Sequence, residues 1–184
     1  MLSKYKGIFL FLIMIFFTTK SLSASGKLAY EFSFNDLDGS QMKLSEFKNK
    51  VIIIINVASQ CGFTRQYEDM QNIWNKYQDK GLVVIGVPSN DFGNQEPGTS
   101  KEIKNFCEAK FGITFPMTEK VSVKGKNAHP FYVWANENYG SGAIPKWNFH
   151  KIVVGRDGKI VDTFASITKP SSKKFVKVIE ENLD

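Results

Sequence analysis

The sequence has few of the side chains that usually bind metals. Its 184 residues include two cysteines and two histidines. His129 and His150 lie far apart, and neither has a cysteine or carboxylate partner at the spacing of metal ligands. A zinc or iron site is therefore not expected. Acyl transfer at a thiol is not indicated either, because it would need a histidine base beside the nucleophile.

The two cysteines do not form a CxxC motif. Cys61 is followed by Gly62, Phe63 and Thr64, and the second cysteine, Cys107, comes much later in the chain. Dithiol exchange at adjacent cysteines is therefore excluded. In an exported protein an even number of cysteines first suggests a structural disulfide, and that interpretation stays open at this point.

The N-terminal apolar run is too short to span a membrane. It comprises the 11 residues GIFLFLIMIFF, from Gly7 to Phe17, whereas a membrane-spanning helix needs roughly 17–25. Two lysines precede the run and TTKSLSAS follows it, as in a secretory signal. We predict a cleavable signal peptide over residues 1–25, with an uncleaved anchor as the weaker alternative. The mature chain would be exported, periplasmic or secreted, without stable membrane association.

The charge balance gives no indication of nucleic-acid binding. The chain has 24 Lys and Arg against 18 Asp and Glu, a net charge of +6, and three of the lysines lie in the first 25 residues. The mature chain is therefore near +3, without a long basic run. Residues 26–184 are enough for one compact domain with a single core.

Two apolar runs predict buried parallel strands, Val51 to Val57 and Leu82 to Val87, because neither alternates with polar residues. Turn signals at Asp38-Gly39 and Asp157-Gly158 predict two hairpins. Helical spacing and caps predict four helices, at about 64–80, 100–111, 130–136 and 171–183, the second capped by Ser100. The twelve-residue segment SNDFGNQEPGTS predicts a functional loop. The order indicates an α/β fold, a central mixed sheet with helices on both faces.

Cys61 lies between the first buried strand and the helix that follows. Unpaired N–H groups and the helix dipole favour an anion there, so we expect a stabilised thiolate. A small buried hydrophobe is the alternative. Peroxide reduction fits such a thiolate if neutral donors surround the sulfur, because the departing oxygen must be stabilised and protonated.

Five motifs resemble the glutathione peroxidase family in the same order: NVASQCGFT, PSNDFGNQEPG, KEIKNFC, FGITFP and WNFHKIVVGRDGK. The resemblance runs from about Phe32 to the C-terminus. It implies a thioredoxin-like fold with an N-terminal β-hairpin extension, and no cofactor. By this resemblance Cys61 is the peroxidatic residue, and Gln95, Trp147 and Asn148 complete the catalytic tetrad. Read without the family, these three would be a loop amide, a core aromatic and a turn residue.

By the same resemblance Cys107 matches the resolving cysteine of the thioredoxin-dependent branch. It would condense with the sulfenic acid of Cys61, and the helix over 100–111 would have to unwind locally for the sulfurs to meet. A static disulfide and a buried helical thiol are the alternatives. Three residues depart from the usual family pattern, Ser89, Asp91 and Thr118. Asp91 could tune the site by its charge.

The resemblance implies a thiol peroxidase that reduces hydrogen peroxide and organic or lipid hydroperoxides. A short segment between Trp134 and Trp147 suggests a monomer. The chain has Cys107, and it has no set of basic residues that matches those with which relatives bind glutathione. Both features favour a thioredoxin-like reductant over glutathione. The alternatives are an exported redox sensor that oxidises a partner protein, and a thiol–disulfide oxidoreductase. A peroxiredoxin is not indicated, because VASQC lacks the expected proline- and threonine-containing run.

Overall fold

The structure is a computed structural model that describes residues 26–184. The predicted signal peptide lies outside the described residues. Within 26–184, none of the helices has the length and apolar character needed to cross a membrane.

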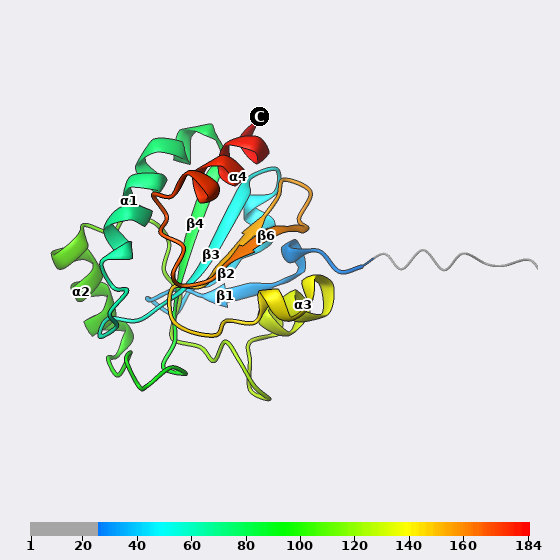
Figure 1. Cartoon of the computed structure of the whole chain (residues 1–184). Coiled ribbons are helices and arrows are strands. Elements are labelled where there is room, and N and C mark those ends of the chain that lie inside the picture. Colours follow the sequence, from blue (N-terminus) through cyan, green and yellow to red (C-terminus); the bar gives the residue numbers. More distant parts are fainter. Residues whose placement is uncertain (1–25) are drawn as a thin grey trace, which may run out of the picture.

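A four-stranded sheet in the order β4-β3-β5-β6 forms the centre of the fold, and a separate hairpin pairs β1 with β2 (Figure 1). Strands β3 and β4 are parallel, and the β3–β5 and β5–β6 pairs are antiparallel. The elements are β1 Ser33–Asn35, β2 Gln41–Lys43, β3 Val51–Val57, α1 Gln66–Tyr77, β4 Leu82–Pro88, α2 Ser100–Phe111, α3 Pro130–Tyr139, β5 Lys151–Val154, β6 Ile160–Phe164 and α4 Lys173–Leu183.

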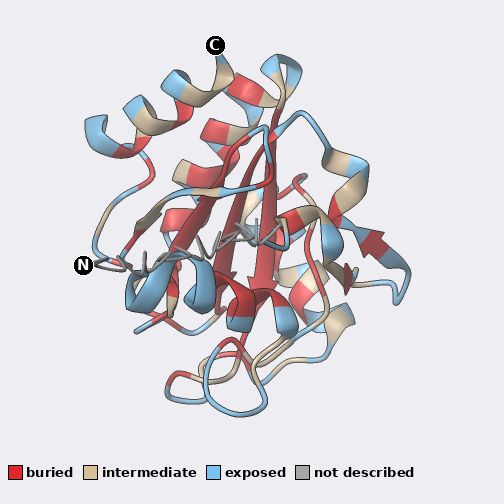
Figure 2. Cartoon of the chain, turned by 90° about the vertical axis from the view of Figure 1, so that its right-hand side faces the viewer, coloured by how far each residue is buried: buried red, intermediate tan, exposed pale blue. Residues whose placement is uncertain are grey.

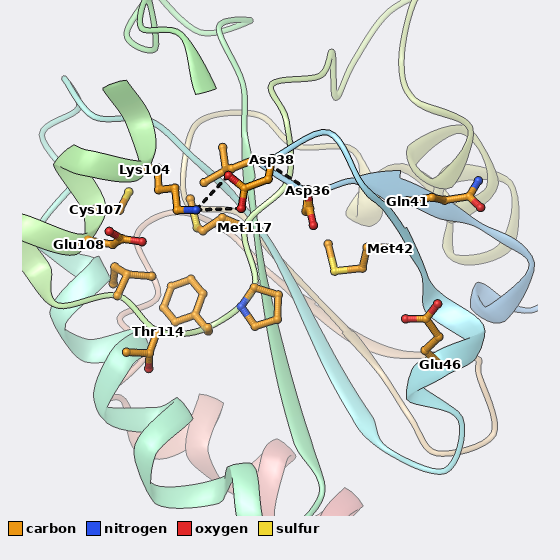
Figure 3. Close-up of a pocket in the computed structure, with 14 residues that line it drawn as sticks. Asp36, Asp38, Gln41, Met42, Glu46, Lys104, Cys107, Glu108, Thr114 and Met117 are labelled. Atoms are coloured by element: carbon orange, nitrogen blue, oxygen red, sulfur yellow. Dashed lines mark hydrogen bonds and ion pairs between the residues drawn. The ribbon is translucent and has the colours of Figure 1, made fainter. Parts of the chain in front are cut away.

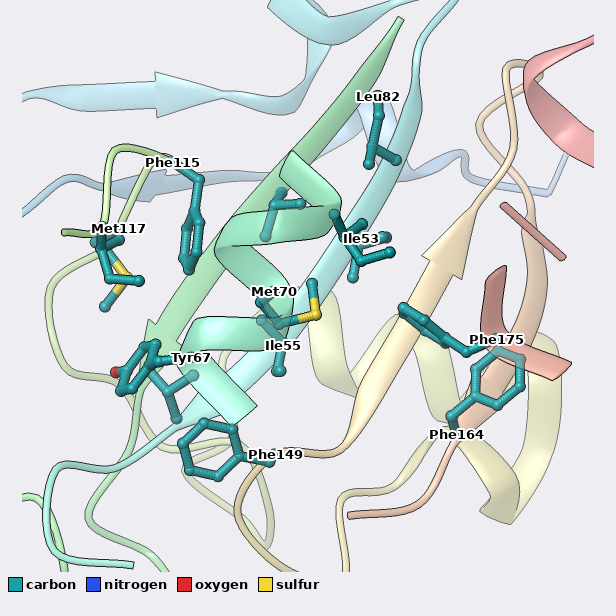
Figure 4. Close-up of a cluster of buried hydrophobic side chains, with 14 of the residues drawn as sticks. Ile53, Ile55, Tyr67, Met70, Leu82, Phe115, Met117, Phe149, Phe164 and Phe175 are labelled. Carbon is teal, nitrogen blue, oxygen red and sulfur yellow. The ribbon is translucent and has the colours of Figure 1, made fainter. Parts of the chain in front are cut away.

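Every residue of β3 and β4 is buried, which shows that other elements cover both faces of these central strands (Figure 2). Successive side chains of a strand point to opposite faces. Ile53 and Ile55 therefore pack with α1, α2 and α4 in one cluster (Figure 4), whereas Ile52 and Ile54 pack with α3 and the hairpin in the other. The predicted mixed sheet with helices on both faces is confirmed.

The predicted strands are close to the observed ones, and most differences lie at the ends of elements. The first hairpin, predicted from Asp38-Gly39, begins at Ser33, and Ala29–Glu31 before it forms a 3-10 helix. Helix α1 begins at Gln66 rather than Thr64 and ends at Tyr77. A 3-10 helix, Gln78–Lys80, follows it and ends at Gly81, which has a left-handed φ of 96°. Helix α3 continues to Tyr139, beyond the predicted end at Asn136.

Thr99 caps α2, so the prediction of Ser100 as the cap was wrong by one residue. The Thr99 backbone N–H donates to Glu102 Oε2 at 2.8 Å, and the Glu102 N–H donates to Thr99 Oγ1 at 3.3 Å. This reciprocal pair is a capping box and stabilises the first turn. At the other end Gly112 has a φ of 59° and its N–H donates to Cys107 O and Glu108 O.

The carboxyl ends of β3 and β4 carry two loops, residues 58–65 and 89–99. The Ser89 N–H donates to Val57 O, and the Gln60 N–H donates to Gln95 O, each at 3.0 Å. The parallel pairing of β3 with β4 therefore brings the Cys61 loop and the Gln95 loop together at one edge.

Lys151 is a buried cation at the start of β5. It has no exposed surface, and its ammonium group donates to Gln66 Oε1 and, at 2.7 Å, to Thr168 O. Burial lowers the pKa of Lys151 to about 7, although the negative charge of Asp69 opposes this shift. The side chain thus links β5 to α1 and to the segment that precedes α4.

We predict that Lys151 makes the fold more stable as the pH rises above neutrality. Between about pH 7 and its ordinary pKa of 10.5 the unfolded chain holds a proton on Lys151 that the folded chain does not. The stability associated with this group is therefore gained as pH rises through this window and lost as pH falls towards 7. Denaturant unfolding at pH 7–9 should show this rise in the wild type and its loss in Lys151→Met. Lys159→Met, which alters a lysine with a 73% exposed side chain, is the control and should keep the wild-type slope. An unchanged slope in Lys151→Met would contradict the prediction.

Candidate active site

Cys61 lies in the tight turn between β3 and α1. Its N–H donates to Thr64 Oγ1 at 3.0 Å, and the Thr64 N–H donates to Cys61 O at 3.0 Å. The Phe63 N–H donates to Cys61 Sγ at 3.4 Å, and the residue is only 9% exposed. The turn therefore directs a backbone donor at the sulfur, an arrangement that favours an anion there. Because α1 begins at Gln66, Cys61 lies further ahead of the helix than the sequence predicted.

Gln95 and Asn148 contact each other directly. Asn148 is fully buried, and its Nδ2 donates to Gln95 Oε1 at 3.0 Å. This bond uses the carbonyl oxygen of the Gln95 amide. It therefore leaves the Nε2 hydrogens of Gln95 free to donate to another acceptor.

Trp147 lies beside the same loop. Its ring is 5.7 Å from the ring of Phe92 between centroids, and the residue is 40% exposed. In the described part of the chain no hydrogen bond joins Cys61 Sγ to Gln95, Trp147 or Asn148. The structure therefore brings the loops of the four predicted residues together, and joins Gln95 to Asn148. Donors of this kind often tighten only when the substrate is bound.

Asn56 holds the Trp147–His150 segment in place, and sequence reasoning missed this residue. Its Nδ2 donates to Trp147 O at 3.2 Å, and its Oδ1 accepts from the His150 N–H at 3.1 Å. Its backbone oxygen accepts from the Phe149 N–H at 2.6 Å. An asparagine in the otherwise apolar run VIIIINV is the signal that could have identified it.

Phe149 has a left-handed backbone with a φ of 64°, which is strained for a residue with a bulky side chain. The ring is fully buried and packs edge-on against Tyr67, with centroids 5.3 Å apart. The hydrogen bond to Asn56 and this packing hold the strained turn. This backbone turn places the neighbouring Asn148 against the Gln95 loop.

Asp91 fixes the Gln95 loop to the chain that follows Lys120. One of its carboxylate oxygens accepts from the backbone N–H groups of Val123 and Lys124 at 2.6 and 3.2 Å, and the Ser122 hydroxyl also donates to the carboxylate. This departure from the family pattern therefore has a structural role, as an anchor for the loop. The sequence had indicated only a charge effect.

Cys107 is buried on the inner face of α2, with 1% of its surface exposed. Burial raises the pKa of its thiol to about 11, although the neighbouring Tyr67 hydroxyl lowers it. Cys107 lines a cavity of about 420 Å³ between α2 and the hairpin (Figure 3), whereas Cys61 lines a different cavity with Arg65 and Lys110. Both cysteines are free thiols.

Comparison with known proteins identifies related sequences. The sequence model of the family described as "Glutathione peroxidase" matches residues 29–136. "Hydroperoxy fatty acid reductase gpx1" of Synechocystis sp. is 50% identical over 149 residues, covering 77% of this chain and 88% of the relative. "Glutathione peroxidase-like peroxiredoxin 2" of Saccharomyces cerevisiae is 44% identical over 147 residues, covering 78% of this chain and 90% of the relative.

Solved structures agree with the sequence comparison. The crystal structure of T. cruzi GPX1 has a TM-score of 0.67 and 30% identity, and the match covers 85% of this chain and 97% of that one. A thioredoxin-family thiol:disulfide interchange protein from Chlorobium tepidum has a TM-score of 0.63 at 19% identity, covering 83% of this chain and 93% of that one. The second likeness supports the thioredoxin-like fold alone.

We predict that Asn56→Ala loosens the Trp147–His150 segment. The change removes two side-chain hydrogen bonds and leaves buried backbone groups unpaired, which should lower the free energy of unfolding by about 1–3 kcal/mol. Hydrogen exchange of the Phe149 and His150 amides should accelerate. Asn182→Ala is the control, because the Asn182 amide bonds to Val178 O within α4 and should leave those amides protected. Unchanged exchange in Asn56→Ala would refute the role of Asn56.

Proposed function

The chain belongs to the glutathione peroxidase family, and on that premise we propose that Cys61 is the thiol with which it reduces hydroperoxides. The chain is a thiol peroxidase, as the names of its relatives, a hydroperoxy fatty acid reductase and a glutathione peroxidase-like peroxiredoxin, support. Its proposed substrates are hydrogen peroxide and organic hydroperoxides, including those of lipids.

The Asn148–Gln95 hydrogen bond is the observation that carries the assignment of the site. Because Asn148 Nδ2 occupies Gln95 Oε1, the amide nitrogen of Gln95 remains available as a donor. Together with the Phe63 N–H on Cys61 Sγ, this supplies neutral donors in the loops around the sulfur. Such donors stabilise a thiolate before the reaction and a departing oxygen anion during it.

The peroxide step follows from this arrangement. The Cys61 thiolate attacks one peroxide oxygen, the O–O bond breaks, and the other oxygen leaves with the bonding pair. The departing oxygen takes a proton to become an alcohol or water, and Cys61 is left as a sulfenic acid. In this proposal Gln95, Trp147 and Asn148 act through their N–H groups on the charge that moves between sulfur and oxygen.

Cys107 resolves the sulfenic acid in the proposed cycle. Its sulfur displaces water from oxidised Cys61 and forms a disulfide, which an external dithiol then reduces. Since Cys107 is buried in α2 and the two cysteines line different cavities, α2 has to open for the sulfurs to meet. A thioredoxin-like protein fits the second reduction better than glutathione, because it delivers two thiols to a disulfide. The proposed enzyme is an exported monomer with a redox-active disulfide.

A redox sensor and a thiol–disulfide oxidoreductase are the alternative functions. A sensor would use the same two cysteines but would be oxidised stoichiometrically rather than turn over. The thioredoxin-like fold is shared with thiol:disulfide interchange proteins, yet Cys61 lacks the second cysteine of a CxxC motif. Steady-state peroxide consumption separates an enzyme from a sensor.

We predict that Cys61→Ser abolishes peroxide consumption, because a serine hydroxyl is not ionised near neutrality. Gln95→Glu should slow the peroxide step by about a hundredfold or more, because the carboxylate can still accept from Asn148 but cannot donate. Stopped-flow measurement with one equivalent of peroxide tests both variants. Gln78→Glu, which lies in the last turn after α1, is the matched control and should react at the wild-type rate. Substantial turnover by Cys61→Ser would remove Cys61 from its proposed role.

We predict that Cys107→Ser reacts once with peroxide at the wild-type rate and then stalls. Cys61 should accumulate as sulfenic or sulfinic acid because no neighbouring thiol condenses with it. Mass spectrometry of the oxidised variant and thioredoxin-supported turnover provide the two measurements. Full thioredoxin-dependent turnover in Cys107→Ser would contradict the two-cysteine cycle and favour direct attack by the external reductant.

A further inference from the structure

Glu96 is a buried carboxylate that the peroxide step does not use. It is 1% exposed, and in the described part of the chain its Oε2 has no hydrogen-bond partner. Its backbone is fixed, because its N–H donates to Asn90 Oδ1 at 2.8 Å and its carbonyl accepts from Lys120 Nζ at 2.9 Å. The Ser59 hydroxyl and N–H act on the carboxylate and lower its pKa, but a buried oxygen without a hydrogen bond of its own is costly, so its retention here calls for a reason.

The position of Glu96 is between the Cys61 turn and α2. Glu96 lines a cavity of about 410 Å³ together with Ser59 and Gln60 on one side and Ile103 and Phe106 on the other. Ile103 lies one helical turn before Cys107 on the buried face of α2. Glu96 therefore lies between residues that precede Cys61 and the turn of α2 that precedes Cys107.

Resolution requires a proton acceptor for Cys107, because the thiolate is the nucleophile. Burial holds the pKa of this thiol at about 11, so few molecules are ionised near neutrality. The groups that act on Cys107 are Tyr67, Glu96 and Glu108. Burial also raises the pKa of the Tyr67 hydroxyl, which is therefore a donor. Glu108 lines the same cavity as Cys107 but is exposed to solvent. Glu96 is the buried carboxylate of this set.

We propose that Glu96 accepts the proton of the Cys107 thiol as Cys107 attacks the sulfenic acid of Cys61. The new bond joins the two sulfurs, the S–O bond of the sulfenic acid breaks, and the hydroxide that leaves takes the proton back from Glu96 to form water. Cys107 is oxidised and the sulfenic sulfur is reduced, so the step needs no other reactant. This role rests on the proposed function, in which Cys107 is the resolving residue.

The surroundings of Glu96 suit a proton acceptor. Burial raises the pKa of its carboxyl and makes it a stronger base than an exposed carboxylate, while the Ser59 hydroxyl and N–H and the charge of Lys120 act in the opposite direction. Resolution should therefore slow as pH falls and Glu96 takes up a proton from solution. The charges of Cys107 and Glu96 both add to the effect of burial in raising the pKa of Tyr67.

A single-turnover experiment on the full mature chain tests the proposal. Wild type, Glu96→Gln, Glu96→Asp and Glu108→Gln are mixed with one equivalent of hydrogen peroxide and quenched with acid at intervals. Mass spectrometry then follows the Cys61 sulfenic acid and the Cys61–Cys107 disulfide separately. Glu96→Gln should form the sulfenic acid at the wild-type rate but the disulfide about a hundredfold more slowly. Glu96→Asp should recover part of the rate, and Glu108→Gln should match the wild type.

The pH profile separates proton acceptance from a structural role. A variant with a merely disturbed α2 would slow resolution by the same factor at every pH. In the wild type the rate should be nearly constant above the pKa of Glu96 and decline below it. In Glu96→Gln only the rare Cys107 thiolate can react, so the rate should rise about tenfold per pH unit. Disulfide formation in Glu96→Gln at or above the wild-type rate would overturn the proposal while leaving the two-cysteine cycle intact. Failure of the wild type to form a Cys61–Cys107 disulfide would overturn the cycle and the role of Glu96 together.

Discussion

The site depends on one buried asparagine at the carboxyl end of β3. Asn56 makes hydrogen bonds through Nδ2, Oδ1 and its backbone oxygen to three residues of the Trp147–His150 segment. The antiparallel register of β3 with β5 extends only to the pair Ile55 and Lys151, so these bonds continue the contact where the ladder has stopped. Together with the Asn56 N–H bond to His150 O and the packing of Phe149 against Tyr67, they hold the strained turn that places Asn148 against Gln95.

The second constraint is the separation of the two thiols. The proposed cycle requires the two sulfurs to bond, but in this structure they line different cavities. Cys107 is sequestered on the inner face of α2, and the capping box and Gly112 hold the two ends of that helix. Yet only Ile103 and Cys107 of α2 are fully buried, and Phe106 and Phe111 pack against the core while only partly buried, so the helix has a limited apolar attachment. Elements with few buried contacts open most easily. Helix α2 is thus closed enough to protect the reduced thiol and attached weakly enough to release it.

The sequence predicted the central sheet well because its signals are local. The apolar runs over 51–57 and 82–87 require burial on both faces, and Asp-Gly pairs specify the two hairpins. The ends of helices were less accurate. Thr99 and Ser100 are both good caps, and only the reach of the Glu102 side chain decides between them.

The motifs identified the candidate residues, but their interactions depend on tertiary structure. The hydrogen bonds of Asp91 to residues 122–124, and those of Asn56 to the Trp147–His150 segment, join parts of the chain that are far apart in sequence. Pattern and propensity do not report such contacts. The asparagine within VIIIINV was visible as an exception to an apolar run, yet its partners could not be named before the fold was known. Glu96 likewise looked like part of a loop until its burial against α2 was seen.

The opening of α2 during the redox cycle is the central claim, and hydrogen exchange tests it most directly. The backbone amides of residues 100–111 are compared in the fully reduced protein and after one equivalent of hydrogen peroxide, with peptide mapping of the disulfide in the same samples. The account predicts that oxidation forms the Cys61–Cys107 bridge and removes the protection of α2, while β3 and β4 stay protected. A bridge formed with α2 still protected, or oxidation that leaves both the helix and Cys107 unchanged, would contradict it.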